Sequence, residues 1–187
     1  MFKKTLITSS LIAIMSLSLM AQGNGQHKNR GDIFNNISTT QALTDAQKEG
    51  LSYIIEEEKV ARDVYLTLYS TWKSRIFKNI AKAEQKHIDA VARLFSKYEV
   101  EEPLTLEDIG LFENAELQKL YDDLIERGNK SLLDALEVGV VVEETDIADL
   151  EELLEAGVPS DFERVYSKLL RASNKHLKAF NRQISRQ

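Results

Sequence analysis

Apolar residues recur every three or four positions along most of this chain, from about residue 44 to the end. This spacing is typical of amphipathic helices that turn one side toward a core. Four segments are long, and they cover residues 44–72, 75–98, 131–157 and 160–184. The pattern therefore predicts an all-α fold in which four long helices pack as a bundle over residues 44–187.

Residues at the ends of these segments agree with the helical pattern. Thr44 and Ser160 each precede a Gln or Glu by three residues, which predicts a capping box at the start of the first and fourth helices. Gly157, followed by Pro159, is typical of a helix end with a left-handed residue. The segment boundaries are thus predicted from capping chemistry as well as from periodicity.

The connections between the segments predict the topology. A break of a few residues near position 73 makes the first two helices antiparallel neighbours. Residues 99–130 contain Pro103, two glycines and one short predicted helix, from Asn114 to about Arg127. This stretch is too long for a hairpin, so we expect a crossover that carries the chain from one end of the bundle to the other.

Acidic and imidazole side chains interrupt the apolar side of every long helix. The polar residues that lie in helical register with the apolar ones are Glu58, Glu84, His87, Glu143 and His176. Because a helix rises about 1.5 Å per residue, Glu58 and His87 lie level across the first hairpin. We expect the whole set to meet near one level of the bundle.

The third helix offers further acidic residues. Glu144 lies beside Glu143 and is a second candidate for the inward position on this helix. Asp146 and Asp149 lie further round the helix, so we expect them to be solvated or to face a partner.

Three carboxylates facing one another in a core would repel strongly, at a cost on the order of several kcal/mol per ion. No Lys or Arg lies on the same helix sides to balance them. One or two divalent cations would remove the repulsion. Carboxylate oxygens combined with imidazole nitrogens suit iron or manganese, with zinc as a further candidate.

Each of these polar residues also has a simpler explanation when it is taken singly. A lone histidine on an apolar helix side is usually a hydrogen-bonded core residue. Arg62 lies four residues after Glu58 and is placed to pair with it, and residues 56–59 (EEEK) could form a partly solvated face. Only the combination of all five residues favours a metal site.

Composition narrows the classes of function. The 187 residues have a formal net charge of −6, which disfavours nucleic acid as a partner because phosphate binding needs a basic face. Cysteine is absent, which excludes disulfides, thiolate metal sites and cysteine nucleophiles.

The first residues have the features of a targeting signal. Lys3 and Lys4 precede an uncharged apolar run that ends near Ala21. This predicts a cleaved signal peptide over residues 1–21, export to a bacterial periplasm and no stable membrane anchor after cleavage. Residues 22–43 are polar and rich in Gly and Asn, and are expected to form a flexible N-terminal segment.

Together the motifs resemble a known superfamily. Glu on helix one, Glu-x-x-His on helix two, a crossover, Glu on helix three and His on helix four are similar to the ferritin-like di-iron carboxylate proteins. Within that superfamily, residues 44–184 resemble the family called domain of unknown function 2202 in the stretches EEEKVARDVY, AEQKHIDAV, VEETDIADLEE and NKHLKAF.

The resemblance implies a metal-binding four-helix bundle. It assigns ligand positions to Glu58, Glu84, His87, Glu143 or Glu144, and His176, and it likens Tyr65 to a tyrosine found near the metal. The chain departs from the superfamily at Ser173, where a second Glu-x-x-His would place a glutamate. Either Glu143 and Glu144 both serve as ligands, or the second metal position is weak.

The expected function is therefore an exported, ferritin-like protein that binds iron. If it is an enzyme, its chemistry would be redox, with Fe(II), peroxide or dioxygen as the reactant and Tyr65 as a hydrogen-bond or electron donor. The alternative is a metal-free helical module that binds another envelope protein. A third hypothesis is iron storage by a homo-oligomer that assembles into a cage.

Overall fold

The computed structural model describes residues 42–187. The predicted signal peptide lies outside this range, as does nearly all of the predicted flexible segment. Within residues 42–187 the chain is all-α, with no strand, which confirms the predicted fold class. No helix in this part of the chain is both long enough and apolar enough to cross a membrane.

Five helices make up the described chain. They are α1 (Asp45–Trp72), α2 (Arg75–Tyr98), α3 (Ala115–Gly128), α4 (Leu132–Ala156) and α5 (Ser160–Ile184). The predicted segments match these bounds to within one or two residues, including the short helix between the second and third long ones.

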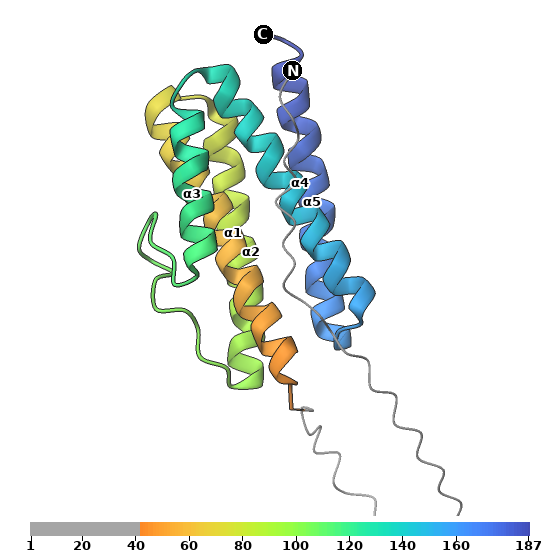
Figure 1. The fold of residues 1–187 in the computed structure, drawn as a ribbon. Helices are drawn as coiled ribbons and strands as arrows, with labels where there is room; N and C mark the ends of the chain where they lie inside the picture. Colours follow the sequence, from red (N-terminus) through yellow and green to blue (C-terminus); the bar gives the residue numbers. More distant parts are fainter. Residues whose placement is uncertain (1–41) are drawn as a thin grey trace, which may run out of the picture. The chain divides into compact units, whose positions relative to one another are not determined.

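The four long helices lie side by side (Figure 1). Helix α1 packs on α2 and α4, and α5 also packs on α2 and α4, so the four close into a ring around two apolar clusters. Neighbours in the ring run antiparallel (Figure 1). Because α2 ends at one end of this helical bundle and α4 begins at the other, residues 99–131 form the predicted crossover, and α3 covers α1 and α4.

One of the three predicted helix-end features is observed in full, since Thr44 makes the capping box with Gln47. Gly157 follows α4 with a positive φ of 83°, but its ψ of 117° lies outside the left-handed helical region. The predicted capping box at Ser160 is wrong. Ser160 is already the first residue of α5, and the N-cap is Pro159. The proline side chain cannot donate or accept a hydrogen bond, so no capping box forms.

Helix α1 is buried on nearly all sides, because the crossover covers the side that faces away from α2 and α4. Lys59 is fully buried, and its ammonium group donates to Asp63 (2.7 Å) and to the carbonyls of Asp108 (2.7 Å) and Leu111 (2.8 Å). These bonds tie the crossover to α1 and satisfy the buried charge.

Glu56 and Arg62 make further bonds of the same kind. Glu56 accepts from the backbone N–H of Glu113 (2.8 Å), and Arg62 donates to the carbonyl of Leu106 (2.8 Å). The expectation of a partly solvated face over residues 56–59 is therefore wrong, since all four side chains are buried.

The helical spacing of Leu133, Val140 and Ile147 predicts that these residues face inward from α4. In the structure they are exposed or only partly buried, so the inward side of α4 is rotated relative to this prediction. Gly139 faces α5 so closely that an added Cβ would overlap the ring of Phe180, and Leu133 is left 43% exposed. The rotation brings Asp146 into the interior, so the expectation that Asp146 is solvated is wrong. Because Gly139 has no side chain, α4 can approach Phe180 of α5 this closely on its inward side.

Candidate metal centre

Five polar side chains meet in the middle of the bundle, one from each of α1, α4 and α5 and two from α2. Glu58, Glu84 and Glu143 are almost completely buried, and His87 and His176 retain side-chain exposures of 13% and 14%. The predicted set is thus brought together at one level of the bundle. Two groups of three have donor atoms close enough to hold a metal ion, and they share Glu84.

The first group lies across the α1–α2 hairpin. Nδ1 of His87 is 3.0 Å from Oε2 of Glu58 and 2.7 Å from Oε2 of Glu84. The helical spacing places Glu84 and His87 on one side of α2, and the short turn at residues 73–74 places Glu58 level with them.

The second group joins the two hairpins. Nδ1 of His176 is 2.9 Å from Oε1 of Glu84 and 3.5 Å from Oε2 of Glu143. The two imidazole rings are stacked, with centroids 5.9 Å apart. Glu84 therefore directs one carboxylate oxygen to each histidine and links the two halves of the centre.

Several of these buried atoms have no hydrogen-bond partner among residues 42–187. They are Oε1 of Glu58, Oε1 of Glu84 and Nδ1 of His176. Nδ1 of His176 and Oε1 of Glu84 form an ion pair, but no hydrogen bond joins them. Buried polar atoms are nearly always hydrogen-bonded, and atoms that converge without hydrogen bonds are suited to a shared cation.

Burial and neighbouring charged groups shift the pKa values of the carboxyl groups in the centre. Burial raises the pKa of Glu58 and of Glu143 to about 7, against the opposing effect of the neighbouring histidines. Burial would also raise the pKa of Glu84, but the two imidazoles beside it outweigh burial and lower that pKa. Among the three carboxylates, Glu84 is therefore the one whose pKa most favours the ionised form.

The pKa values of both histidines are raised, which favours the protonated imidazole. Burial would lower the pKa of His87, but the adjacent Glu58 and Glu84 raise it to about 11. The pKa of His176 is raised to about 10 by Glu143 and Glu84, again against the effect of burial. Both imidazoles are therefore protonated at neutral pH unless a cation replaces the proton.

Tyr65 lies two turns after Glu58 on α1 and is completely buried. Its hydroxyl donates a 2.6 Å hydrogen bond to Oε1 of Glu143. Burial, followed by the nearby negative charge of Glu143, raises the pKa of Tyr65 well above its usual range. Tyr65 is thus a fixed donor that orients one carboxylate of the centre.

The structure does not bring every predicted residue to this place. Glu144 is exposed on α4 and lies outside both groups of donor atoms. Arg62 does not pair with Glu58; it donates to Asp63 and to Gln85, each at 2.8 Å. The simpler explanation for Glu58 is therefore wrong.

A second acidic group beside the centre was not predicted from the sequence. Ser173, three residues before His176 on α5, donates a hydrogen bond to the buried Asp146. Glu57 lies near Asp146 and Asp149, and burial, followed by repulsion from Asp149, raises its pKa well above the ordinary value. The small side chain of Ser173 was the available signal, because it leaves room for an acid from the facing helix.

Comparisons with known proteins agree with this fold. The family model of the uncharacterized protein domain DUF2202 matches residues 47–187. Uncharacterized protein MJ0754 of Methanocaldococcus jannaschii is 47% identical over 145 residues, which are 78% of each chain. The crystal structure of hypothetical protein MJ0754 from Methanococcus jannaschii is similar with a TM-score of 0.77 at 46% identity, covering 79% of this chain and 84% of that one. The chain belongs to the DUF2202 family.

Proposed function

We propose that this protein is an exported, ferritin-like metal-binding protein that holds iron at Glu58, Glu84, His87, Glu143 and His176. The observation that carries the proposal is the pair of donor groups that share Glu84, with buried oxygen and nitrogen atoms left without a hydrogen bond. Manganese or zinc would suit the same donors, and the two groups correspond to one or two ions.

The residues of the centre have separate roles in this proposal. Glu84 bridges the two halves, and Glu58 and Glu143 each complete one of them. Tyr65 fixes the orientation of Glu143 through its hydrogen bond. Iron bound by such donors would supply one-electron redox chemistry, with Fe(II), peroxide or dioxygen as the reactant.

Substitution of single carboxylates tests the shared role of Glu84. Glu84→Gln should abolish binding of both ions, because this residue belongs to both donor groups. Glu58→Gln and Glu143→Gln should each weaken one position. The experiment is anaerobic titration of Fe(II) into the purified protein, with binding followed by calorimetry.

Glu144→Gln is the matched control, since it removes an exposed carboxylate next to Glu143 on α4. Its metal content should equal that of the unaltered protein. Equal metal binding by Glu84→Gln and Glu144→Gln would overturn the proposed site.

A metal-free binding module is the second candidate, and one observation favours it. The crossover exposes Leu104, Ile109 and Leu111, with 92%, 58% and 55% of their surfaces accessible. Exposed apolar side chains gathered on one segment are typical of protein-binding surfaces. Metal-free protein whose melting temperature does not change on adding Fe(II), Mn(II) or Zn(II) would support this candidate.

A further inference from the structure

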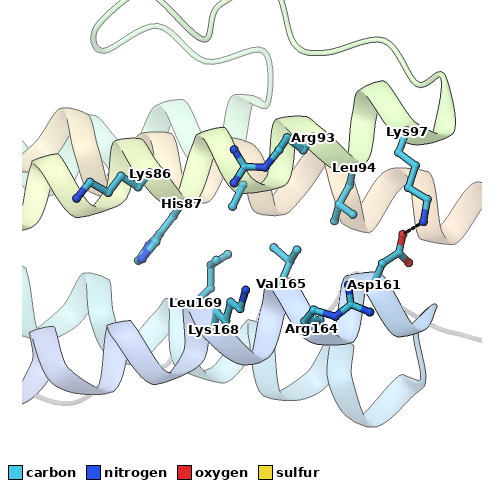
Figure 2. A pocket seen from close by; sticks show the side chains of 11 residues that line it. Lys86, His87, Arg93, Leu94, Lys97, Asp161, Arg164, Val165, Lys168 and Leu169 are labelled. Carbon is cyan, nitrogen blue, oxygen red and sulfur yellow. Dashed lines mark hydrogen bonds and ion pairs between the residues drawn. The ribbon is translucent and has the colours of Figure 1, made fainter.

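A groove of about 450 Å³ runs between α2 and α5, on the outside of the bundle (Figure 2). Its volume falls within the roughly 300–1,000 Å³ typical of small-molecule sites. Along α2 it extends from Lys86 to Lys97, which corresponds to about 17 Å at the rise of a helix. His87 lines one end, so the groove adjoins the candidate metal centre.

Cationic side chains dominate the walls of this groove. They are Lys86, Arg93 and Lys97 from α2, and Arg164 and Lys168 from α5. Asp161 is the one acidic residue of the lining, and it already accepts from Lys97 (2.6 Å) and Tyr98 (2.9 Å), as Figure 2 shows for Lys97. The other four cations have no hydrogen bond or ion pair within residues 42–187.

This concentration of positive charge contrasts with the chain as a whole, whose net charge is −6. Helices α2 and α5 each contain six Lys and Arg against two acidic residues, whereas α4 contains nine acidic residues and no Lys or Arg. Unpaired like charges repel one another, so an acidic protein gains nothing in stability by gathering them in one groove.

The cations of the groove are not explained as counter-charges to the buried carboxylates of the centre, because most of them lie too far away. Arg93 lies six residues along α2 from His87, and Arg164 lies twelve residues along α5 from His176. At a helical rise of 1.5 Å these cations are about 9 and 18 Å from the centre along the helix axes. Charges in water that are separated by more than about 8 Å are largely screened at physiological ionic strength.

The floor of the groove is apolar. It consists of Ala90, Leu94, Val165 and Leu169, of which Leu94 and Leu169 are buried. A ligand that fits both surfaces has an apolar body for the floor and negative groups for the walls.

We propose that this groove binds a small organic anion with two or more negative groups and an apolar body between them. One negative group lies among Arg93, Arg164 and Lys168, and another reaches Lys86 beside His87. Binding in the groove does not require a metal. The further step, that this anion is the ligand or substrate class of the centre, rests on the proposed function.

Decanedioate, a linear dicarboxylate, is a suitable probe, with decane-1,10-diol and inorganic phosphate as comparisons. Calorimetry on the purified protein at low ionic strength should show decanedioate binding about tenfold more tightly than either comparison. Its affinity should fall as salt is added. Equal binding of the diol, or equal binding of phosphate, would overturn the inference.

The double variant Arg93→Gln/Lys168→Gln should weaken decanedioate binding about tenfold, because it removes one charge from each wall. The matched control is Lys78→Gln/Arg182→Gln, which removes one exposed cation from each of the same helices outside the groove lining. Lys78 lies 5.5 Å from the ring centroid of Tyr69 and so faces α1 rather than α5. Equal losses in both double variants would show that net charge alone determines binding.

Metal content and oligomeric state, measured on the same proteins, separate the remaining outcomes. Tight decanedioate binding with no metal uptake would support the groove and overturn the proposed metal function. A salt-sensitive oligomer that only the groove variant dissociates would show that the acidic α4 of a second copy occupies the groove, and it would overturn the small-anion inference.

Discussion

At the scale of single residues, the hydroxyl of Tyr65 holds the carboxylate of Glu143 in one orientation. Glu143 is buried and accepts a hydrogen bond from Tyr65 at one oxygen, while its other oxygen lies 3.5 Å from His176. Such a donor fixes the rotamer of the carboxylate, and its removal leaves a buried acceptor unsatisfied.

Tyr65→Phe should therefore lower the free energy of unfolding by about 1–3 kcal/mol, the cost of leaving a buried acceptor unsatisfied. The effect should be larger at pH 8 than at pH 5, because Glu143, with a pKa of about 7, is ionised only at the higher pH. Urea denaturation at both pH values measures it.

Tyr166→Phe is the control for this substitution. Tyr166 is equally buried, and its hydroxyl makes no hydrogen bond within residues 42–187. Losses of the same size in the two variants would show that the bond from Tyr65 to Glu143 contributes nothing specific.

At the scale of elements, the crossover is held to α1 by buried polar side chains rather than by apolar packing alone. Lys59 is central to this arrangement, because it donates to two crossover carbonyls and packs on the ring of Phe112 at 3.9 Å. Removing one partner of a buried charged network leaves the others without compensation.

Lys59→Met should cost about 3–5 kcal/mol of stability, the usual cost of breaking a buried ion pair on one side. It should also make residues 99–114 the first site of limited proteolysis. Thermal melting and mass spectrometry of the digest provide the two measurements.

The matched substitution is Lys119→Met, which breaks an exposed pair with Asp123 (2.6 Å) on α3. Exposed pairs contribute about 0–1 kcal/mol, so this variant should behave like the unaltered protein. Similar losses in the two variants would contradict the role assigned to Lys59.

At the scale of the whole molecule, the protonation of the centre couples stability to pH. Glu58 and Glu143 have pKa values of about 7 in the folded chain against an ordinary 4.5, so the folded state binds more protons than the unfolded state between these values. His87 and His176, raised from 6.5 to about 11 and about 10, extend the same difference to alkaline pH. The stability of the metal-free protein should therefore fall as pH rises from about 4.5 to 10.

A bound metal ion replaces these protons, so the stabilisation by metal should increase with pH over the same range. The measurement is the difference in melting temperature with and without Mn(II) at pH 5, 7 and 9. Calorimetry at pH 7 in buffers of different ionisation enthalpy should show proton release on binding.

Glu84→Gln serves as the reference, because this substitution should abolish the metal-dependent part of the difference at every pH. A metal-induced stabilisation that does not change between pH 5 and 9 would contradict the assignment of the histidines as ligands.

The sequence by itself determined the helices, their order and four polar residues of the centre, and it left the fifth open between Glu143 and Glu144. These follow from local properties, namely a period of 3.6 residues, capping chemistry and the rise of a helix, which place Glu58 level with His87 before any packing is known. Membership of the DUF2202 family was also predicted correctly, because the stretches that carry it lie on these helices.

Only the tertiary structure decided which sides of the helices are buried. The apolar pattern of α4 is ambiguous, and the packing of α4 on α5, where Gly139 contacts Phe180, places Asp146 inward and leaves Glu144 exposed. The burial of Glu56 and Lys59 depends on a crossover that covers α1 from about 50 residues further along the chain, and the cationic groove exists only where α2 meets α5. Local periodicity cannot determine these features, because each depends on the surface of a second element that is distant in sequence.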